Sequence, residues 1–221
     1  MTLSSRITHH ISEFIHDPKA QKTALKYIIA ALVIVIALGG AGALYYRYHR
    51  GLVQKAQATF SQAFANYQKA LQSDNAQEWA QLEELWKVNY QNHRSTLFAP
   101  YFLAFQADAA LHQGKQEQAL RLMDDALINM SKDGLYYVYA IKRALMQIDS
   151  GQAKLQTKGV QNLTALAEDK HIPQQDEAIY YLGYTAWTQQ QPQKAQQIWS
   201  ALLKKEPSIW SRKAQALLES H

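Results

Sequence analysis

Two patterns of hydrophobic and polar residues divide the chain. Residues 27–46, YIIAALVIVIALGGAGALYY, are twenty consecutive positions without a charged side chain. From Leu52 onward, apolar residues instead recur every three or four positions in a stretch rich in Ala, Gln and Leu. This period is that of an α-helix with one buried face. The pattern therefore predicts an apolar segment near the N-terminus, followed by an all-α region.

The uncharged run has the length of a membrane span. At 1.5 Å per residue it covers roughly 30 Å as a helix, which matches the hydrocarbon core of a bilayer. Lys26 and Arg47 bracket the run, and tyrosines stand at both of its ends, where the headgroup region favours them. We therefore expect a single transmembrane helix over 27–46, an N-terminal tail over 1–26 and a folded domain over 51–221.

A cleaved signal peptide is the alternative to a membrane anchor. Ala41-Gly42-Ala43 has the small-x-small form of a processing site, and cleavage there would release a secreted protein. The 26 residues before the apolar run and the length of the run both exceed those of a typical signal peptide. Charge leaves the orientation of an anchor open, because three Lys or Arg residues lie within about 20 residues of the run on each side.

Helix pairs recur within the all-α region. The spacing of small, bulky and proline residues resembles the tetratricopeptide repeat, a helix-turn-helix unit of about 34 residues. The C-terminal copy contains Ile179, Leu182, Gly183, Ala186, Ala195, Trp199, Leu202 and Pro207, and an earlier copy contains Leu103, Ala107, Ala110, Leu111, Gly114, Ala119, Met123 and Ala126. Since one such unit does not bury its own apolar face, three or more must stack, and we expect a right-handed array of helix pairs.

A looser unit is predicted between these two copies. Its small residue Gly159 follows Ala119 by 40 residues and precedes Ala195 by 36. Both intervals exceed the usual repeat length. We therefore expect insertions in the turn over 152–158 and around 169–175.

The two ends of the array are less regular. A weaker first pair is expected over 52–73 and 76–90, with Ala80 as its small residue, and a final helix over 208–218 is expected to cap the array. Gly114 is well placed for a left-handed residue that ends a helix. A plain bundle of Ala-rich helices is the alternative architecture.

The net charge of +5 belongs mainly to the N-terminal fifth of the chain. Residues 1–50 hold six Lys or Arg against two acidic residues, which gives +4 and leaves +1 for all the rest. The array therefore has no basic surface that would favour nucleic acid. Without Cys, and without a phosphate loop, a dinucleotide fingerprint or an HExxH motif, the sequence predicts no enzyme, no metal and no cofactor.

Tyrosines supply the candidate partner-binding residues. Tyr136, Tyr137 and Tyr139 cannot all face one core, because a helix turns through about 300° over this stretch. Exposed tyrosines are favoured at protein interfaces. Together with Tyr180 and Tyr184 they form a candidate binding set on the inner face of the array, and ordinary core packing is the alternative.

The order of these parts resembles a known family. The resemblance is carried by Ala65-Asn66-Tyr67-Gln68-Lys69-Ala70 and by Ala107–Gly114 followed by Glu117–Leu127. The chain is similar to the bacterial ancillary subunits of the Sec translocon, inner-membrane proteins with a periplasmic tetratricopeptide-like domain. The resemblance implies a cytoplasmic N-terminus, a periplasmic C-terminal domain, and translocon components, periplasmic chaperones or client polypeptides as partners.

The expected function is therefore that of a membrane-anchored adaptor that joins the translocon to periplasmic chaperones. A self-assembling scaffold of the cell envelope, which would be a homo-oligomer, is the alternative. The longer N-terminal tail and the many aromatic residues depart from the family pattern and leave the particular partner open.

Overall fold

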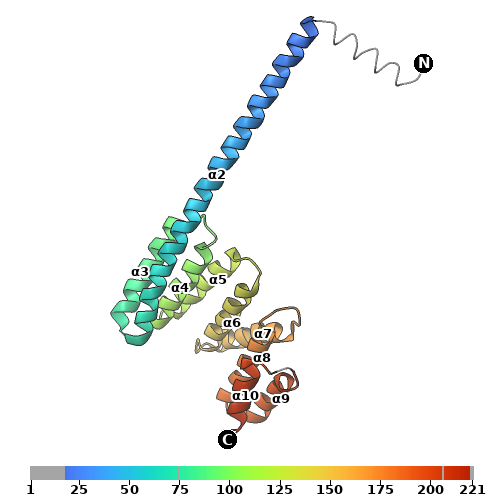
Figure 1. Ribbon diagram of the computed structural model, residues 1–221. Coiled ribbons are helices and arrows are strands. Elements are labelled where there is room, and N and C mark those ends of the chain that lie inside the picture. Colours follow the sequence, from blue (N-terminus) through green and yellow to red (C-terminus); the bar gives the residue numbers. More distant parts are fainter. Residues whose placement is uncertain (1–17, 74, 206, 220–221) are drawn as a thin grey trace, which may run out of the picture. The chain divides into compact units, whose positions relative to one another are not determined.

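The computed structural model describes residues 18–73, 75–205 and 207–219, with side chains at residue 35 and from residue 38 onward within these ranges. All regular structure in these ranges is helical (Figure 1). The helices are α2 (Pro18–Ser73), α3 (Ala76–His93), α4 (Ala99–His112), α5 (Gln116–Asn129), α6 (Gly134–Ile148), α7 (Ala153–Glu168), α8 (Gln175–Thr188), α9 (Pro192–Leu203) and α10 (Ile209–Glu219).

The chain divides into two compact units, residues 1–54 and 55–221, and α2 contributes to both. Residues 1–17 of the predicted tail lie outside the described residues, as do the side chains of most of the predicted membrane segment. Over the part of the chain that is described, no helix combines the length and hydropathy needed to cross a bilayer. The bounds 1–26, 27–46 and 51–221 stay predictions.

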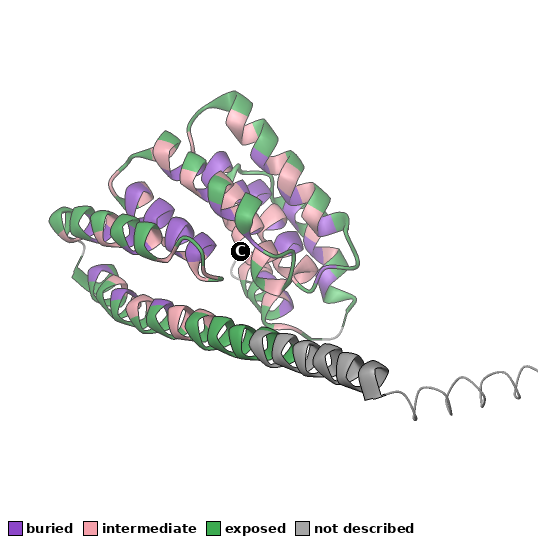
Figure 2. Cartoon of the chain, turned by 90° about the horizontal axis from the view of Figure 1, so that it is seen from above, coloured by how far each residue is buried: buried purple, intermediate pink, exposed green. Residues whose placement is uncertain are grey.

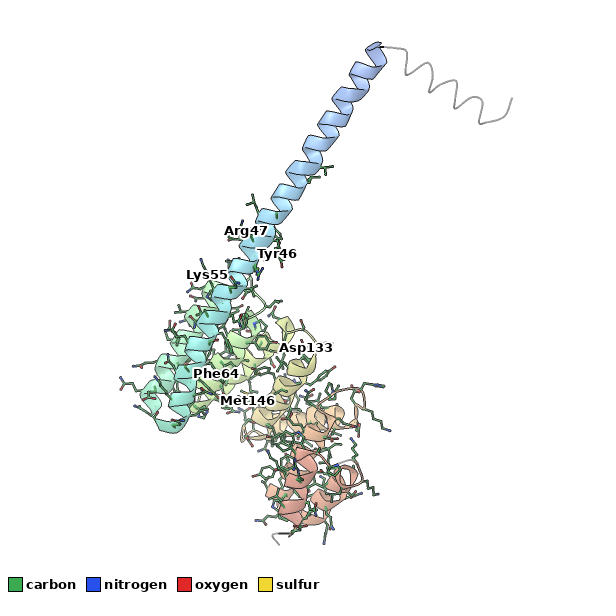
Figure 3. All side chains as sticks on the ribbon, in the orientation of Figure 1. Tyr46, Arg47, Lys55, Phe64, Asp133 and Met146 are labelled. Atoms are coloured by element: carbon green, nitrogen blue, oxygen red, sulfur yellow. The ribbon has the colours of Figure 1, made fainter. Side chains whose placement is uncertain are left out.

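The second unit begins with an aromatic core formed by α2, α3 and α4. Ala56, Ala63 and Ala70 are buried at intervals of seven residues, so a narrow seam of small side chains on α2 contacts its neighbours. Trp86 is fully buried in this core, and the centroid of its ring lies 5.0 Å from that of Phe105. Figure 2 shows the buried residues along the helices of this unit, and Figure 3 labels Phe64 on α2 within it.

Helices α4 to α9 form three pairs that repeat one packing scheme. In each pair, both helices bury a small residue at equivalent positions, and the second helix buries a larger side chain four residues later. The three sets are Ala107, Ala119 and Met123 in α4–α5, Ala144, Gly159 and Leu163 in α6–α7, and Gly183, Ala195 and Trp199 in α8–α9. This confirms the predicted register of the repeats.

Two of the small residues are glycines because the paired helices approach too closely for a methyl group. A Cβ atom at Gly159 would lie 2.6 Å from the carbonyl oxygen of Ala144. A Cβ atom at Gly183 would overlap the indole ring of Trp199. The close approach of α6 thus requires glycine at residue 159, whereas the large side chain of Trp199 requires it at residue 183.

The turn inside each pair contains a residue in the left-handed region, seven positions after the small residue of the first helix. These residues are Gly114 with φ 74°, Gly151 with φ 71° and Gln190 with φ 59°. The conformation ends the first helix and turns the chain into the second, as predicted for Gly114. Glycine adopts it without a steric penalty, whereas Gln190 does not.

Two expectations about the repeats are wrong. Ala80 is exposed, and α3 instead buries Trp79, Leu82 and Trp86, because α2 supplies the small residues at this contact.

No turn insertion occupies 152–158, since α7 is already helical from Ala153. Relative to the equivalent helices, α7 is extended by three residues at its start. The stretch AKLQTK contains no glycine or proline that would oppose a helix. The expected insertion around 169–175 is the loop between α7 and α8.

The final helix packs on α8 and α9 and buries Ser211 and Ala214. Its start is held by a reciprocal pair of hydrogen bonds. The backbone N–H of Ser208 donates to Ser211 Oγ over 2.8 Å, and that of Ser211 donates to Ser208 Oγ over 3.2 Å. This helix lies where the sequence predicts one over 208–218.

Candidate functional site

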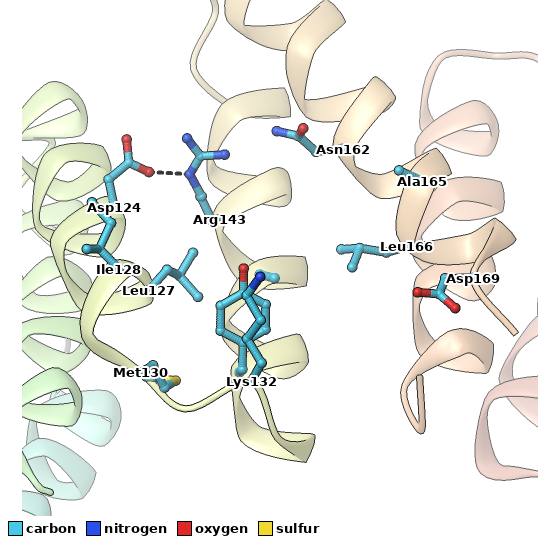
Figure 4. A pocket seen from close by; sticks show the side chains of 12 residues that line it. Asp124, Leu127, Ile128, Met130, Lys132, Arg143, Asn162, Ala165, Leu166 and Asp169 are labelled. Atoms are coloured by element: carbon cyan, nitrogen blue, oxygen red, sulfur yellow. Dashed lines mark hydrogen bonds and ion pairs between the residues drawn. The ribbon is translucent and has the colours of Figure 1, made fainter. Parts of the chain in front are cut away.

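A groove of about 710 Å³ lies against α6, between α5 and α7, and we name it the first groove (Figure 4). Three helices and the α5–α6 loop supply its lining. The lining residues are Asp124, Leu127, Ile128, Met130, Lys132, Tyr136, Ala140, Arg143, Asn162, Ala165, Leu166 and Asp169. Since α6 packs more extensively on α7 than on α5, the groove opens where the repeats are joined least tightly.

The rim of the first groove on the α5 side is apolar. Ile128 is 79% exposed, although it lies at the end of a helix whose opposite face is buried. Met130, which follows α5, is buried beneath this rim. Asp133 caps α6 by accepting a hydrogen bond from the backbone N–H of Leu135 over 3.1 Å, and this cap fixes where α6 begins. The end of α5 thus presents a large aliphatic side chain to solvent beside a fixed helix.

The floor of the first groove is small and polar. Ala140 leaves space above α6, and the adjacent Arg143 donates through Nε to Asp124 on α5. Opposite, Asn162 on α7 donates through Nδ2 to Gln147 Oε1 over 2.8 Å. The Arg143 side chain is 20% exposed and lines the groove. A guanidinium has five N–H donors, and those not used by Asp124 suit carboxylate or carbonyl oxygens.

Apolar walls combined with a few fixed polar groups are typical of a ligand-binding groove. The opening is wide, it follows a helix rather than enclosing a cavity, and its rim is aliphatic. This arrangement suits a polypeptide segment, whose side chains contact the walls while its carbonyl groups accept hydrogen bonds.

The structure separates the five predicted tyrosines. Tyr136 lines the first groove, and the ring of Tyr137 meets that of Tyr136 edge to face at 5.3 Å. Tyr139 packs against the core of α4 and α5, with its ring 6.0 Å from that of Tyr101. All three tyrosines on α6 are partly exposed, so none of them lies wholly in the core.

Tyr180 and Tyr184 lie on α8 and do not line the first groove; Tyr180 contacts the final helix, α10. Their rings stack at 6.1 Å, and Tyr180 lies 5.3 Å from the ring of Trp210. Lys213 Nζ stands 4.4 Å from the centre of the Trp210 ring, a cation–π contact. Tyr184 remains 40% exposed. Whether any of the five tyrosines binds a partner stays a prediction.

A buried polar cluster joins α2, α4 and α6 and was not anticipated from the sequence. Asp108 is 4% exposed, accepts a hydrogen bond from the hydroxyl of Tyr67, and pairs with Lys142 Nζ at 2.7 Å. Burial, with Asp108 beside it, raises the pKa of Tyr67 well above its usual range. One charged residue in the apolar helix APYFLAFQADAALH was the available signal. Because the carboxylate is fully partnered, we assign it a structural role.

Within the described residues, no three His, Asp or Glu side chains gather in a way that would hold a metal ion. Glu83 illustrates how the carboxylates are used. Burial opposes its ionisation, but hydrogen bonds from Lys115, Gln113 and Gln118 lower its pKa. The group ties α3 to the start of α5, which is a structural task.

No protein-family model matches the chain, and no curated protein matches it. Among solved structures, it resembles the crystal structure of a tetratricopeptide repeat protein from Parabacteroides merdae, with a TM-score of 0.53 and 19% sequence identity. The likeness covers 75% of this chain and 59% of that one, so this chain spans less than two thirds of that protein. At such identity the likeness concerns the fold alone, and it confirms an all-α fold with tetratricopeptide-like repeats.

Proposed function

We propose that the protein is a membrane-anchored adaptor that binds polypeptide segments in the first groove. The observation that carries this proposal is the exposed aliphatic rim at Ile128 beside the polar floor at Arg143. Apolar side chains gathered with a few fixed polar groups along a groove are typical of a surface that binds another molecule. The tetratricopeptide-like fold supports the same reading, since stacked repeats create extended surfaces used in binding.

The anchor in this proposal is the uncharged segment 27–46. At its C-terminal end, Leu38, Leu44 and Tyr46 are 66–70% exposed along α2, and Figure 3 shows Tyr46 beside Arg47. Exposed leucines followed by tyrosines suit a helix that leaves the hydrocarbon core and enters the headgroup region. A bilayer would remove this apolar surface from water, which is the main source of free energy for insertion.

The location and partners in this proposal follow from the family resemblance. We propose an inner-membrane protein with a cytoplasmic N-terminus and a periplasmic repeat domain. It would act as an ancillary subunit of the Sec translocon, linking it to periplasmic chaperones or to emerging client chains. The scaffold alternative differs in its partner, which would be a second copy of the chain.

Site-specific photocrosslinking in membranes tests the proposal. A photoreactive amino acid is placed at Ile128 of the full chain, and the matched control places it at Leu97, which is 76% exposed and outside the first groove. We expect adducts with a translocon component, a periplasmic chaperone or a nascent secretory chain at residue 128 and not at residue 97. Equal adducts at both positions, or none of these partners at residue 128, would contradict the adaptor. Adducts only with a second copy of the chain would favour the scaffold.

A further inference from the structure

A second groove of about 510 Å³ lies one repeat further along the array, against α8 and between α7 and α9. It is open to solvent and belongs to the same compact unit as the first groove. Its lining residues are Thr164, Ala167, Glu168, Lys170, Gln175, Ile179, Leu182, Ile198, Ala201 and Lys205.

Every lining residue of the second groove is the repeat equivalent of a lining residue of the first. The offsets follow from the small residues of the paired helices: 40 positions from Ala119 to Gly159, 39 from Ala144 to Gly183 and 36 from Gly159 to Ala195. With these offsets, Asp124, Leu127, Ile128 and Met130 correspond to Thr164, Ala167, Glu168 and Lys170; Tyr136, Ala140 and Arg143 to Gln175, Ile179 and Leu182; and Asn162, Ala165 and Asp169 to Ile198, Ala201 and Lys205.

We infer that the two grooves are consecutive subsites for one extended polypeptide, with an acidic side chain in the first groove and a large aliphatic side chain in the second. The inference rests on the proposed function and specifies the class of segment that the adaptor takes. Since the grooves repeat at the same register, one strand of polypeptide meets both in succession along this side of the array.

The floors of the two grooves differ in the side chain that they accept. In the second groove Ile179, Leu182 and Ile198 replace the alanine, arginine and asparagine of the first, so the floor changes from polar to aliphatic. The added carbons of Ile179 relative to Ala140 also fit the smaller volume of the second groove. Burying a Leu, Ile or Phe side chain on such a floor removes its apolar surface from water, which favours binding.

Hydrogen-bond donors favour an acidic side chain in the first groove, whose lining of two cations and two acids is neutral overall. Lys132 and Arg143 are the cations of its lining, and the guanidinium retains donors beyond the Nε that binds Asp124. The acid on the opposite wall, Asp169, already accepts a hydrogen bond from the backbone N–H of His171 over 2.9 Å. A carboxylate of the partner would therefore bind the guanidinium donors that Asp124 does not use.

The distance between the grooves limits the spacing of the two anchors. Packed helices lie roughly 8–10 Å apart, so α6 and α8, separated by α7, are roughly 10–20 Å apart. An extended chain advances about 3.3 Å per residue. The acidic and aliphatic side chains are therefore expected about three to six residues apart.

The test uses the full chain and fluorescein-labelled peptides of about ten residues in a Gly/Ser background. The two-anchor peptide carries an aspartate and a leucine within the stated spacing, and it is made with each of the two orders. Two other peptides carry only the aspartate or only the leucine. Binding is followed by fluorescence anisotropy. Ala165→Trp fills the first groove and Ala201→Trp the second, at exposed and repeat-equivalent alanines, while Ala80→Trp places the same side chain on exposed surface outside both grooves.

We expect each groove-filling variant to lower the affinity for the two-anchor peptide about tenfold, which corresponds to about 1.4 kcal/mol per anchor. The affinity for the leucine-only peptide should fall in Ala201→Trp and not in Ala165→Trp. Ala80→Trp should leave all affinities unchanged. Circular dichroism and thermal unfolding verify that each variant remains folded.

Two results would overturn the inference while leaving the proposed function standing. The first is an affinity for the two-anchor peptide that Ala201→Trp does not lower. The second is the absence of peptide binding in a chain that still crosslinks a translocon component or chaperone at Ile128, which would show that the groove takes a folded surface. If the crosslinks at Ile128 are absent as well, both the inference and the proposed function fail.

Discussion

The helix pairs α6–α7 and α8–α9 follow the same backbone plan with different side chains. Both bury small residues where their helices meet, both turn through a left-handed residue, and both form a groove on the same side. They differ in which helix carries the glycine, in the residue at the turn, and in the floor of the groove. The comparison teaches that the repeat constrains size at the helix contact but leaves the chemistry of the groove free.

The largest expected effect concerns the glycine of α8. Gly183→Ala places a methyl group against the Trp199 indole, and we expect the free energy of unfolding to fall by about 2–3 kcal/mol. In a Trp199→Met background, the substitution recreates the small, small and methionine set of α4–α5, and its cost should largely disappear. Urea denaturation of the four proteins of this cycle measures the coupling. An equal cost in both backgrounds would show that the indole contact is not the cause.

The second expected effect is a loss of stability at alkaline pH that depends on Tyr139 of α6. Burial, with Tyr101 and Asp108 nearby, raises the pKa of Tyr139 to about 12, whereas α8 carries Ala178 at the equivalent position. Because the raised pKa favours the neutral phenol in the folded state, the stabilisation is complete below about pH 10 and is lost as the pH rises toward 12.

Tyr139→Phe should therefore reduce the loss of stability between about pH 10 and pH 12 by an amount on the order of 2 kcal/mol. Chemical denaturation at both ends of this range measures it. Tyr184→Phe, which removes the hydroxyl of an exposed tyrosine on α8, is the matched control. An identical alkaline loss in the wild type and in Tyr139→Phe would assign the effect to other groups.

The third expected effect concerns the turns. Gln190 adopts φ 59° where the equivalent residues are Gly114 and Gly151. Gln190→Gly should raise the free energy of unfolding by about 1 kcal/mol, since a side chain in the left-handed region costs roughly that much. Gly151→Gln should lower it by a similar amount, and thermal unfolding of both variants compares the two turns. A destabilising Gln190→Gly would mean that the glutamine side chain makes a stabilising contact.

The smallest expected effect on stability comes from making the two grooves alike. Arg143→Leu copies Leu182 and removes an ion pair whose carboxylate, on Asp124, is 43% exposed. We expect the free energy of unfolding to change by less than about 1 kcal/mol, because partly exposed pairs contribute little. Affinity for the two-anchor peptide should nevertheless fall about tenfold, to that of the leucine-only peptide. Unchanged affinity would remove Arg143 from the first subsite.

The sequence predicted the parts of the fold that depend on local pattern. Gly159, Gly183 and Trp199 lie where the repeat spacing placed them, because the small and large positions of a helix pair follow directly from helical geometry. The first pair was misjudged at Ala80, although Glu84 and Lys87, at helical spacing from it, indicate an exposed face. What the local pattern does not show is which helix supplies the small residues instead. That decision depends on α2, whose alanines take the role.

Most of the candidate site, by contrast, was not predicted from the sequence. Of the five predicted tyrosines, Tyr136 lines the first groove, and Arg143 and Ile128 were not singled out. Their roles arise from three helices and a loop that come together only on folding. The spacing of residues within one helix therefore does not predict these roles. Asp108 and Lys142 were missed for the same reason, because the buried pair joins α4 to α6.

By itself, the sequence determined a chain of amphipathic helices in repeated pairs, with the excess positive charge around one uncharged segment. These features follow from composition and period, which act over a few residues at a time. Only the tertiary structure decided which faces the stacked repeats leave open. A groove exists where neighbouring helices fail to fill the space between them, and that depends on side-chain volumes from three helices at once, as with Ala140 in one repeat and Ile179 in the next.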